Sequence, residues 1–260
     1  MATAPGADYA AMLKRWLSQI LWIAPEGVII ALLLAINAIV PSIWIGAGMT
    51  LLVVTFISRI TALYLTSRAL FQARWEAADA LATVASMLHP WSPDALALRG
   101  AIALARSDSA TAVRLLQRAQ RLAPNRSAIT AALSGAYLEE GEPQAAAVAA
   151  RRALELDPAN AAAHLHLAQA LAAIGARAEL IEDQLRAGLA HHPEPDAEAS
   201  LRCALAHHLA QEERWAEAAL ALSAARAVLP HCSAAQRAIV SQRIAEIDRA
   251  IHSAREDHAA

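Results

Sequence analysis

The sequence predicts an all-α protein in which an apolar helical hairpin is followed by a stack of helix pairs and a final capping helix. Three observations support this fold class. The chain is 57% hydrophobic but only 4% aromatic, so much of its apolar content is alanine, the strongest helix former. Residues 27–58 contain no charged side chain. Downstream of this run, prolines recur at nearly constant intervals.

The charge balance argues against a nucleic-acid partner. The formal net charge is -2 and Lys14 is the only lysine, so the chain has no basic field to neutralise phosphates. Cys203 and Cys232 are the only cysteines, and two thiols do not make a disulfide framework. We therefore expect free thiols in a reducing compartment.

The first 25 residues are expected to lie at a membrane surface. Residues 8–23 have the pattern of an amphipathic helix with one apolar side. The residues turned to lipid would be Trp16, Leu17, Ile20 and Leu21. Residues 1–25 are therefore predicted to form an interfacial helix that leads into the apolar run.

The apolar run predicts a transmembrane hairpin over residues 26–65. As one helix, its uncharged residues would extend about 48 Å, against a hydrocarbon core of about 30 Å. Pro41 would interrupt a helix near the middle of the run, so we expect two helices that meet around residues 37–42. Aromatic residues that favour membrane interfaces are spaced by about one crossing each: Trp22, Trp44 and Tyr64.

Basic residues on both sides of the run predict its orientation. Lys14 and Arg15 precede the run, and Arg59, Arg68 and Arg74 follow it. The positive-inside rule places both flanks in the cytoplasm, which requires an even number of crossings. We therefore expect an integral protein of the cell membrane whose helix pairs face the cytoplasm.

Two other arrangements of the apolar run stay open. Pro25 and Glu26 leave a first arm of about 15 residues, or about 22 Å, which is shorter than the hydrocarbon core. A kinked single span would place the downstream helices on the other side of the membrane. A re-entrant segment would enter the bilayer without crossing it.

Downstream of residue 59 the sequence repeats itself. Prolines stand at intervals of 34, 34, 35 and 37 residues: Pro90, Pro124, Pro158, Pro193 and Pro230. A small residue stands five positions before each of them: Ala85, Ala119, Ala153, Gly188 and Ala225. A proline ends a helix, and a small residue lets two helices cross closely without overpacking.

These features, and above all the segment GAYLEEGEPQAAAVAARRALELDPAN, resemble the tetratricopeptide-repeat (TPR) family. The resemblance covers residues 59–230 and implies a right-handed α-solenoid, in which pairs stack because one pair cannot bury both of its apolar faces. The implied repeats are 59–92, 93–126, 127–160, 161–194 and 195–232. The sequence departs from the family where a large aromatic residue is usual in the first helix: Leu96, Thr130, His164 and Arg202 stand there.

Both ends of the repeat array have predicted features. The first helix of the first repeat, about 59–71, would directly continue the second membrane helix. Residues 233–254 are predicted to form a capping helix, since Ser233 and Gln236 have the spacing of a capping box. An apolar stripe on this helix would close the array: Val240, Ile244, Ile247 and Ile251. Residues 255–260 are left as a tail.

The resemblance implies a protein-binding groove, because the first helix of each repeat lines the concave side of TPR proteins. The lining mapped onto this sequence is mostly small and apolar: Ala97, Leu98, Ala101, Leu104, Ala131, Ala132, Leu138, Glu139, Leu165, His166, Gln169, Cys203 and His207. It lacks the lysine, arginine and asparagine set with which some members grip a carboxylate. We therefore expect an apolar or amphipathic helix as the ligand, the alternative being that these alanines only pack helices together.

The sequence thus predicts a membrane-anchored scaffold or adaptor for protein–protein interaction or complex assembly, with no cofactor and no enzymatic activity. It contains no phosphate loop, nucleophile elbow or zincin helix. One alternative is a single-span chaperone or assembly factor that faces the outside of the membrane. Another is a metal-binding or enzymatic domain, for which Cys203 and His207 have the four-residue spacing of a metal pair.

Overall fold

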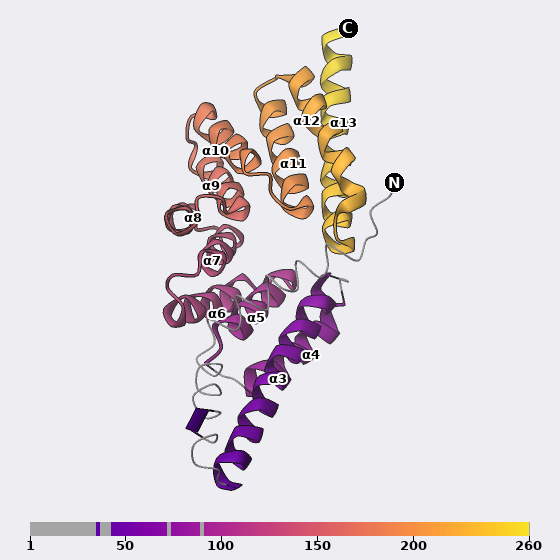
Figure 1. The fold of residues 1–260 in the computed structure, drawn as a ribbon. Coiled ribbons are helices and arrows are strands. Elements are labelled where there is room, and N and C mark those ends of the chain that lie inside the picture. The colour runs from indigo at the N-terminus through magenta and orange to yellow at the C-terminus, as the bar shows by residue number, and fades with distance from the viewer. Residues whose placement is uncertain (1–34, 37–42, 72–73, 89–90, 260) are drawn as a thin grey trace. The chain divides into compact units, whose positions relative to one another are not determined.

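The computed structural model is helical wherever it has regular structure in the residues that it describes (Figure 1). These are residues 35–36, 43–71, 74–88 and 91–259. The prediction of an all-α chain is confirmed for them. The interfacial helix expected over residues 1–25, most of the first hairpin arm and the turn expected at 37–42 lie outside the described residues. The chain divides into two compact units, Met1–Thr61 and Ala62–Ala260.

The first unit contains the start of α3, a helix that runs from Ile43 to Phe71. Within the described residues, Gly46–Ala69 is the one helical stretch that is long and apolar enough to cross a membrane. Hydroxyl groups in it bond to the helix itself: the Thr50 hydroxyl donates to the Gly46 carbonyl oxygen at 2.9 Å. The Ser58 hydroxyl makes a similar bond at 2.8 Å. Such bonds lower the cost of placing a hydroxyl in an apolar environment.

The second unit is a series of helix pairs followed by one longer helix (Figure 1). Its helices after the end of α3 are α4 (Trp75–Leu88), α5 (Pro93–Ala105), α6 (Ser109–Leu122), α7 (Ser127–Glu139), α8 (Pro143–Leu156), α9 (Ala161–Ile174), α10 (Ala178–Ala190), α11 (Pro195–Gln211), α12 (Trp215–Val228) and α13 (Ala234–Ala259). A short 3₁₀ turn, Leu229–His231, precedes α13. Each of α5 to α12 packs against the helix that follows it, which is the connectivity of a solenoid.

Polar side chains define where several of these helices begin. Ser92 Oγ accepts a hydrogen bond from the Ala95 amide, and Asn160 Oδ1 accepts one from the Ala163 amide at 3.0 Å. Both satisfy amides that a helix N-terminus otherwise leaves unpaired. Gly175 ends α9 with a φ of +77°, a left-handed conformation that glycine adopts without steric cost.

Small residues allow the helices to approach closely at every joint. Ala119 and Ala153, two of the alanines that stand five positions before a proline, are fully buried. At Gly188 an added Cβ would come within 3.0 Å of the His164 Cβ and 3.1 Å of the Leu201 side chain. Interiors at this density do not accept a larger side chain without moving a helix, so the repeat spacing depends on these positions.

Helix α13 begins where we expected a capping helix but continues beyond residue 254 to Ala259, through residues that we predicted to be a tail. Its apolar stripe packs on α11 and α12. The predicted capping box is only half formed. The Ser233 hydroxyl accepts a hydrogen bond from the Gln236 amide at 3.3 Å, but the Ser233 amide donates to Asp196 Oδ1 at 2.7 Å. The Gln236 side chain instead donates to the Ser200 hydroxyl, so a contact with α11 replaces the expected local bond.

Candidate functional site

The first helix of each pair forms the inner series of the solenoid. Helices α5, α7, α9 and α11 each contact the next member of this series. The second helices α6, α8 and α10 make no such contact with one another in the part of the chain that the structure describes. In a curved stack, helices that touch along the series lie on the inside of the curve, so α5, α7, α9 and α11 carry the inner surface.

Most of the predicted groove residues retain accessible surface on these inner helices. Three are exposed: Ala101, Glu139 and His207. Eight are partly exposed: Ala97, Leu98, Leu104, Ala132, Leu138, Leu165, His166 and Gln169. Two are buried, because Ala131 packs with Ala153 and Ala163, and Cys203 packs in the cluster that includes α13. A ligand has no access to Ala131 or Cys203, so both are left out of the proposed surface.

His166 joins α7 to α9 and does not point freely into the groove. Its Nδ1 lies 2.9 Å from the Ala131 carbonyl oxygen and 2.9 Å from the Ser134 hydroxyl. Because a carbonyl oxygen only accepts, the first of these bonds requires a proton on Nδ1. Burial lowers the pKa of His166, which the bond to Ala131 partly offsets. A neutral His166 therefore fixes the spacing of two inner helices.

A small cavity between α9, α10 and α11 brings two predicted residues together. Its volume is about 50 Å³. Gln169 and His207 stand at its rim with Gln211, and the lining is otherwise mostly apolar: Ala168, Ala172, Ile181, Leu185, Ala204 and His208. Burial, followed by the nearby Arg243 and His208, lowers the pKa of His207, so this ring is neutral at pH 7. The cavity suits a small apolar side chain better than an anion.

The sequence prediction missed most of this cavity. Gln211 lies four residues after His207, and Ala172 lies three residues after Gln169. This spacing places each of them on the same helix face as its predicted neighbour, so helical periodicity could have found both. Ile181 and Leu185 belong to α10, the second helix of its pair. They could not be assigned to the inner surface from a rule that uses first helices alone.

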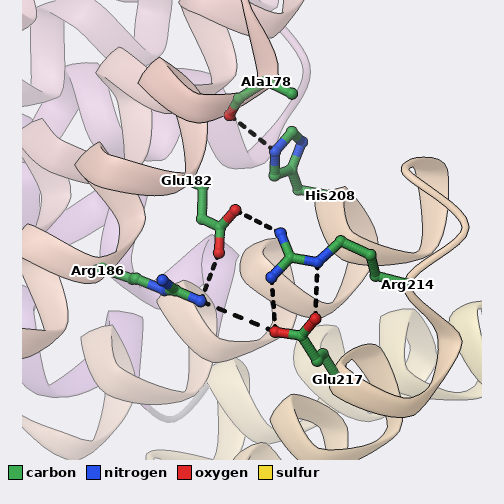
Figure 2. A network of polar contacts seen from close by, with 6 residues as sticks. All are labelled: Ala178, Glu182, Arg186, His208, Arg214 and Glu217. Carbon is green, nitrogen blue, oxygen red and sulfur yellow. Dashed lines mark hydrogen bonds and ion pairs between the residues drawn. The ribbon is translucent and has the colours of Figure 1, made fainter.

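Beside the cavity, a polar network ties α10 to α12 (Figure 2). Arg214 Nη1 lies 2.6 Å from Glu182 Oε2, and Arg186 Nη2 lies 2.5 Å from Glu182 Oε1. Arg214 also donates to both carboxylate oxygens of Glu217, at 2.7 and 2.6 Å. His208 Nε2 lies 3.0 Å from the Ala178 carbonyl oxygen and donates to it (Figure 2).

The charges of this network are paired with one another. The hydrogen bonds that Arg214 donates to Glu217, and then the one to Glu182, raise the pKa of Arg214, and the bond from Arg214 lowers the pKa of Glu217. The Arg214–Glu217 pair is bidentate, which is the strongest geometry for such a pair. A group that is already matched in this way has little affinity left for a ligand, so we assign the network a structural role at the joint of the last repeats.

Two further features are candidates for a ligand site: a hollow at the start of α12 and the Cys203–His207 pair. Neither has the set of unpaired polar groups that a ligand site needs. A hollow of about 430 Å³ is bounded by one continuous turn, Glu213–Glu217, and its charged groups include the paired Arg214 and Glu217. Within the described residues, no group of three or more histidine, cysteine, aspartate or glutamate side chains is placed to hold a metal ion. The Cys203–His207 pair therefore has no third protein ligand there.

The fold is similar to those of solved TPR and related structures. TTC0263, a thermophilic TPR protein of Thermus thermophilus, superposes with a TM-score of 0.62 at 22% identity, over 73% of this chain and 98% of that one. PilF of Pseudomonas aeruginosa gives a TM-score of 0.57 at 15% identity, over 78% of this chain and 89% of that one. A mutant O-GlcNAc transferase of Thermobaculum terrenum gives 0.51 at 20% identity, over 54% of this chain and 27% of that one.

No protein-family model matches the chain. A comparison with proteins of curated function also finds no match. At these identities the structural likeness establishes the fold alone. The class that it defines is the TPR-like α-solenoid, which confirms the predicted architecture of the repeat array.

The contact between Gly135 and His166 predicts a context-dependent effect of Gly135→Ala. An added Cβ would come within 2.9 Å of the His166 Cε1, so we expect the change to destabilise the protein by about 1–3 kcal/mol. In a His166→Ala background the clash is gone, and the higher helix propensity of alanine should make the same change neutral or stabilising by up to about 1 kcal/mol. Urea unfolding of the full chain in detergent measures both. If Gly135→Ala lowered the free energy of unfolding equally in the two backgrounds, the clash with His166 would not be its cause.

The lowered pKa of Glu217 predicts a pH-dependent contribution to stability. Because the folded pKa lies below the unfolded value near 4.5, the Arg214–Glu217 pair stabilises the fold above that pH and loses its effect as the pH falls through the folded value. We expect the unfolding temperature of Glu217→Gln to decrease less steeply below about pH 4.5 than that of the parent protein. Glu213→Gln, which removes an exposed carboxylate from the same turn, is the control and should keep the parent slope.

Proposed function

We propose that this chain is a membrane-anchored TPR scaffold whose inner surface holds an apolar or amphipathic helix of a partner protein. In this proposal α3 lies in the membrane and the helix pairs from α4 onward present the binding surface. The protein assembles or recruits other proteins and carries out no reaction itself.

The proposed type of partner rests on the difference between the inner and outer surfaces of the solenoid. The accessible residues of the predicted groove are mainly alanine and leucine, with Glu139, His166, Gln169 and His207 as the polar members. The second helices turn charged residues outward: Arg114, Arg118, Arg121, Arg151, Arg152 and Glu155 are all exposed. A low-charge inner surface with a small apolar cavity fits the apolar face of a helix, which is a common ligand of grooves.

The exposed side chains of α3 support the membrane part of the proposal. Trp44 is 84% exposed and Leu51 is 66% exposed, and Ile43, Val54 and Ile57 are also largely exposed. A helix that turns large apolar residues outward along several turns has an unfavourable surface for water. A bilayer removes this cost, and 24 residues of helix, Gly46–Ala69, are enough to cross its hydrocarbon core.

The basic residues around the apolar run support a cytoplasmic location for the solenoid, as part of the same proposal. Arg68 and Arg74 follow the second arm, and Lys14 and Arg15 precede the first. A second candidate is a single crossing with the solenoid on the opposite side, acting as a chaperone or assembly factor. The short first arm before Pro41 favours this candidate, so the topology requires a direct test.

Membrane retention and topology test the anchor. We expect the full chain to stay in the membrane fraction after alkaline carbonate extraction, because α3 inserts in the hydrocarbon core. A reporter fused after Ala260 should give a cytoplasmic signal, since a hairpin returns the chain to its starting side. Release by carbonate would contradict the anchor. Retention with an external signal would contradict the hairpin and favour the single-span candidate.

Site-specific crosslinking tests the inner surface. A photoreactive residue in place of Ala101, which is exposed on α5, should capture a discrete partner in membranes of the source cells. The matched control replaces Val148, an exposed apolar residue on α8, and should not capture it. Adding Leu98→Asp should reduce capture at Ala101 by about tenfold or more, as expected for loss of an apolar contact in a groove. Equal capture from Val148 would contradict a groove-specific partner.

A further inference from the structure

The outer face of α4 and the turn after it carry large apolar residues with no described cover. Met87 and Trp91 are each 75% exposed, and Val84 is about half exposed. Val84 and Met87 are three residues apart, so they lie on one side of the helix, and Trp91 stands three positions after its last residue, Leu88. We call these three residues the first-repeat apolar face.

The equivalent positions of the next two repeats have a different character. Pro90, Pro124 and Pro158 give the register, since they are 34 residues apart. The counterparts of Val84 are Arg118 and Arg152, those of Met87 are Arg121 and Glu155, and those of Trp91 are Asn125 and Ala159. All six counterparts are exposed. Five of the six counterparts are polar and none is a large apolar residue, whereas all three positions of the first repeat are large and apolar.

The packing of the second unit places this face beside the end of the candidate membrane span. Ala69 of α3 shares a buried cluster with Ala78 near the start of α4, and Ala62 shares one with Ala85 near its end. Helix α4 is therefore antiparallel to the last turns of α3 and returns toward the level of Ala62. Met87 follows Ala85 in that direction. Tyr64, a residue type that favours membrane interfaces, is exposed at this level of α3.

We propose that the first-repeat apolar face lies in the interfacial layer of the bilayer that holds α3. This inference rests on the proposed membrane anchor and adds a second point of contact between the protein and lipid. Tryptophan is favoured at the headgroup level because its ring is apolar and its N–H is polar. Transfer of the apolar side chains of Met87 and Val84 from water to this layer is also favourable.

The surroundings of this face favour lipid over a protein partner. No charged residue lies between Ala80 and Leu88. Arg99 Nη1 donates to the hydroxyl of Ser86, the residue before Met87, at 3.3 Å, so a cation that can attract lipid phosphates stands next to this face. Helix α4 follows the end of α3 after three residues, so in this proposal the face stands next to the bilayer surface at which the span ends.

Fluorescence quenching by lipid tests this contact in the full chain. An environment-sensitive fluorophore is attached to Met87→Cys, to Leu51→Cys in the span, or to Val148→Cys on α8. Cys203 and Cys232 are buried, and burial raises the pKa of both thiols, so the native cysteines should react little. The protein is reconstituted in phosphatidylcholine and phosphatidylglycerol vesicles that carry a nitroxide quencher on the lipid. We expect loss of emission at positions 51 and 87 and none at 148.

The outcomes separate this inference from the anchor on which it rests. Quenching at 51 without quenching at 87 would leave the anchor in place and overturn the interfacial contact, whether water or another protein covers the face. No quenching at 51 would overturn both. Quenching at all three positions would also contradict the inference, because the contact would not be specific to the first repeat.

A second variant tests whether the exposed tryptophan holds the face on the lipid. Adding Trp91→Glu to Met87→Cys should restore most of the emission at position 87, since a carboxylate is excluded from the interfacial layer. Adding Val148→Glu as the matched control should leave the quenching at 87 unchanged. Equal quenching with and without Trp91→Glu would overturn the role of Trp91.

Discussion

Close approach of neighbouring helices at alanine and glycine positions is the constraint on which this structure depends. Ala119 and Ala153 are fully buried where helices cross, and Gly188 lies so close to His164 and Leu201 that even one methyl group would crowd them. Each helix pair is too apolar to be stable alone, and stacking at this short distance buries both of its faces. Because the prolines are regularly spaced, the same close packing is repeated from one helix pair to the next.

The same constraint shapes the surface of the solenoid. Because alanine fills the joints, the accessible positions of the predicted groove are mainly alanine and leucine, and exposed arginines gather on α6 and α8. The polar contacts of the last repeats, from Glu182 to Arg214 and Glu217, use their charges within the fold. The predicted groove, in contrast, contains one charged residue, Glu139.

The sequence predicted the repeat architecture well, because the small-residue and proline positions that define it are local and periodic. Side-chain partners across the stack were not predictable in the same way. His166 was placed in the groove, but its ring bonds to Ala131 on the preceding inner helix, a contact between residues 35 positions apart. Gln236 was expected to bond to Ser233, but it reaches Ser200 on α11. The missed cavity residues on α10 belong to a helix that the family rule assigns to the outside.

The asymmetry between inner and outer helices has a mechanical consequence. The inner helices touch along the series, and the outer helices α6, α8 and α10 do not touch one another among the described residues. The inner series therefore holds the stack together, and a change in the angle between neighbouring pairs breaks no contact among α6, α8 and α10. We expect such a stack to change its curvature more easily than one whose outer helices also touched one another.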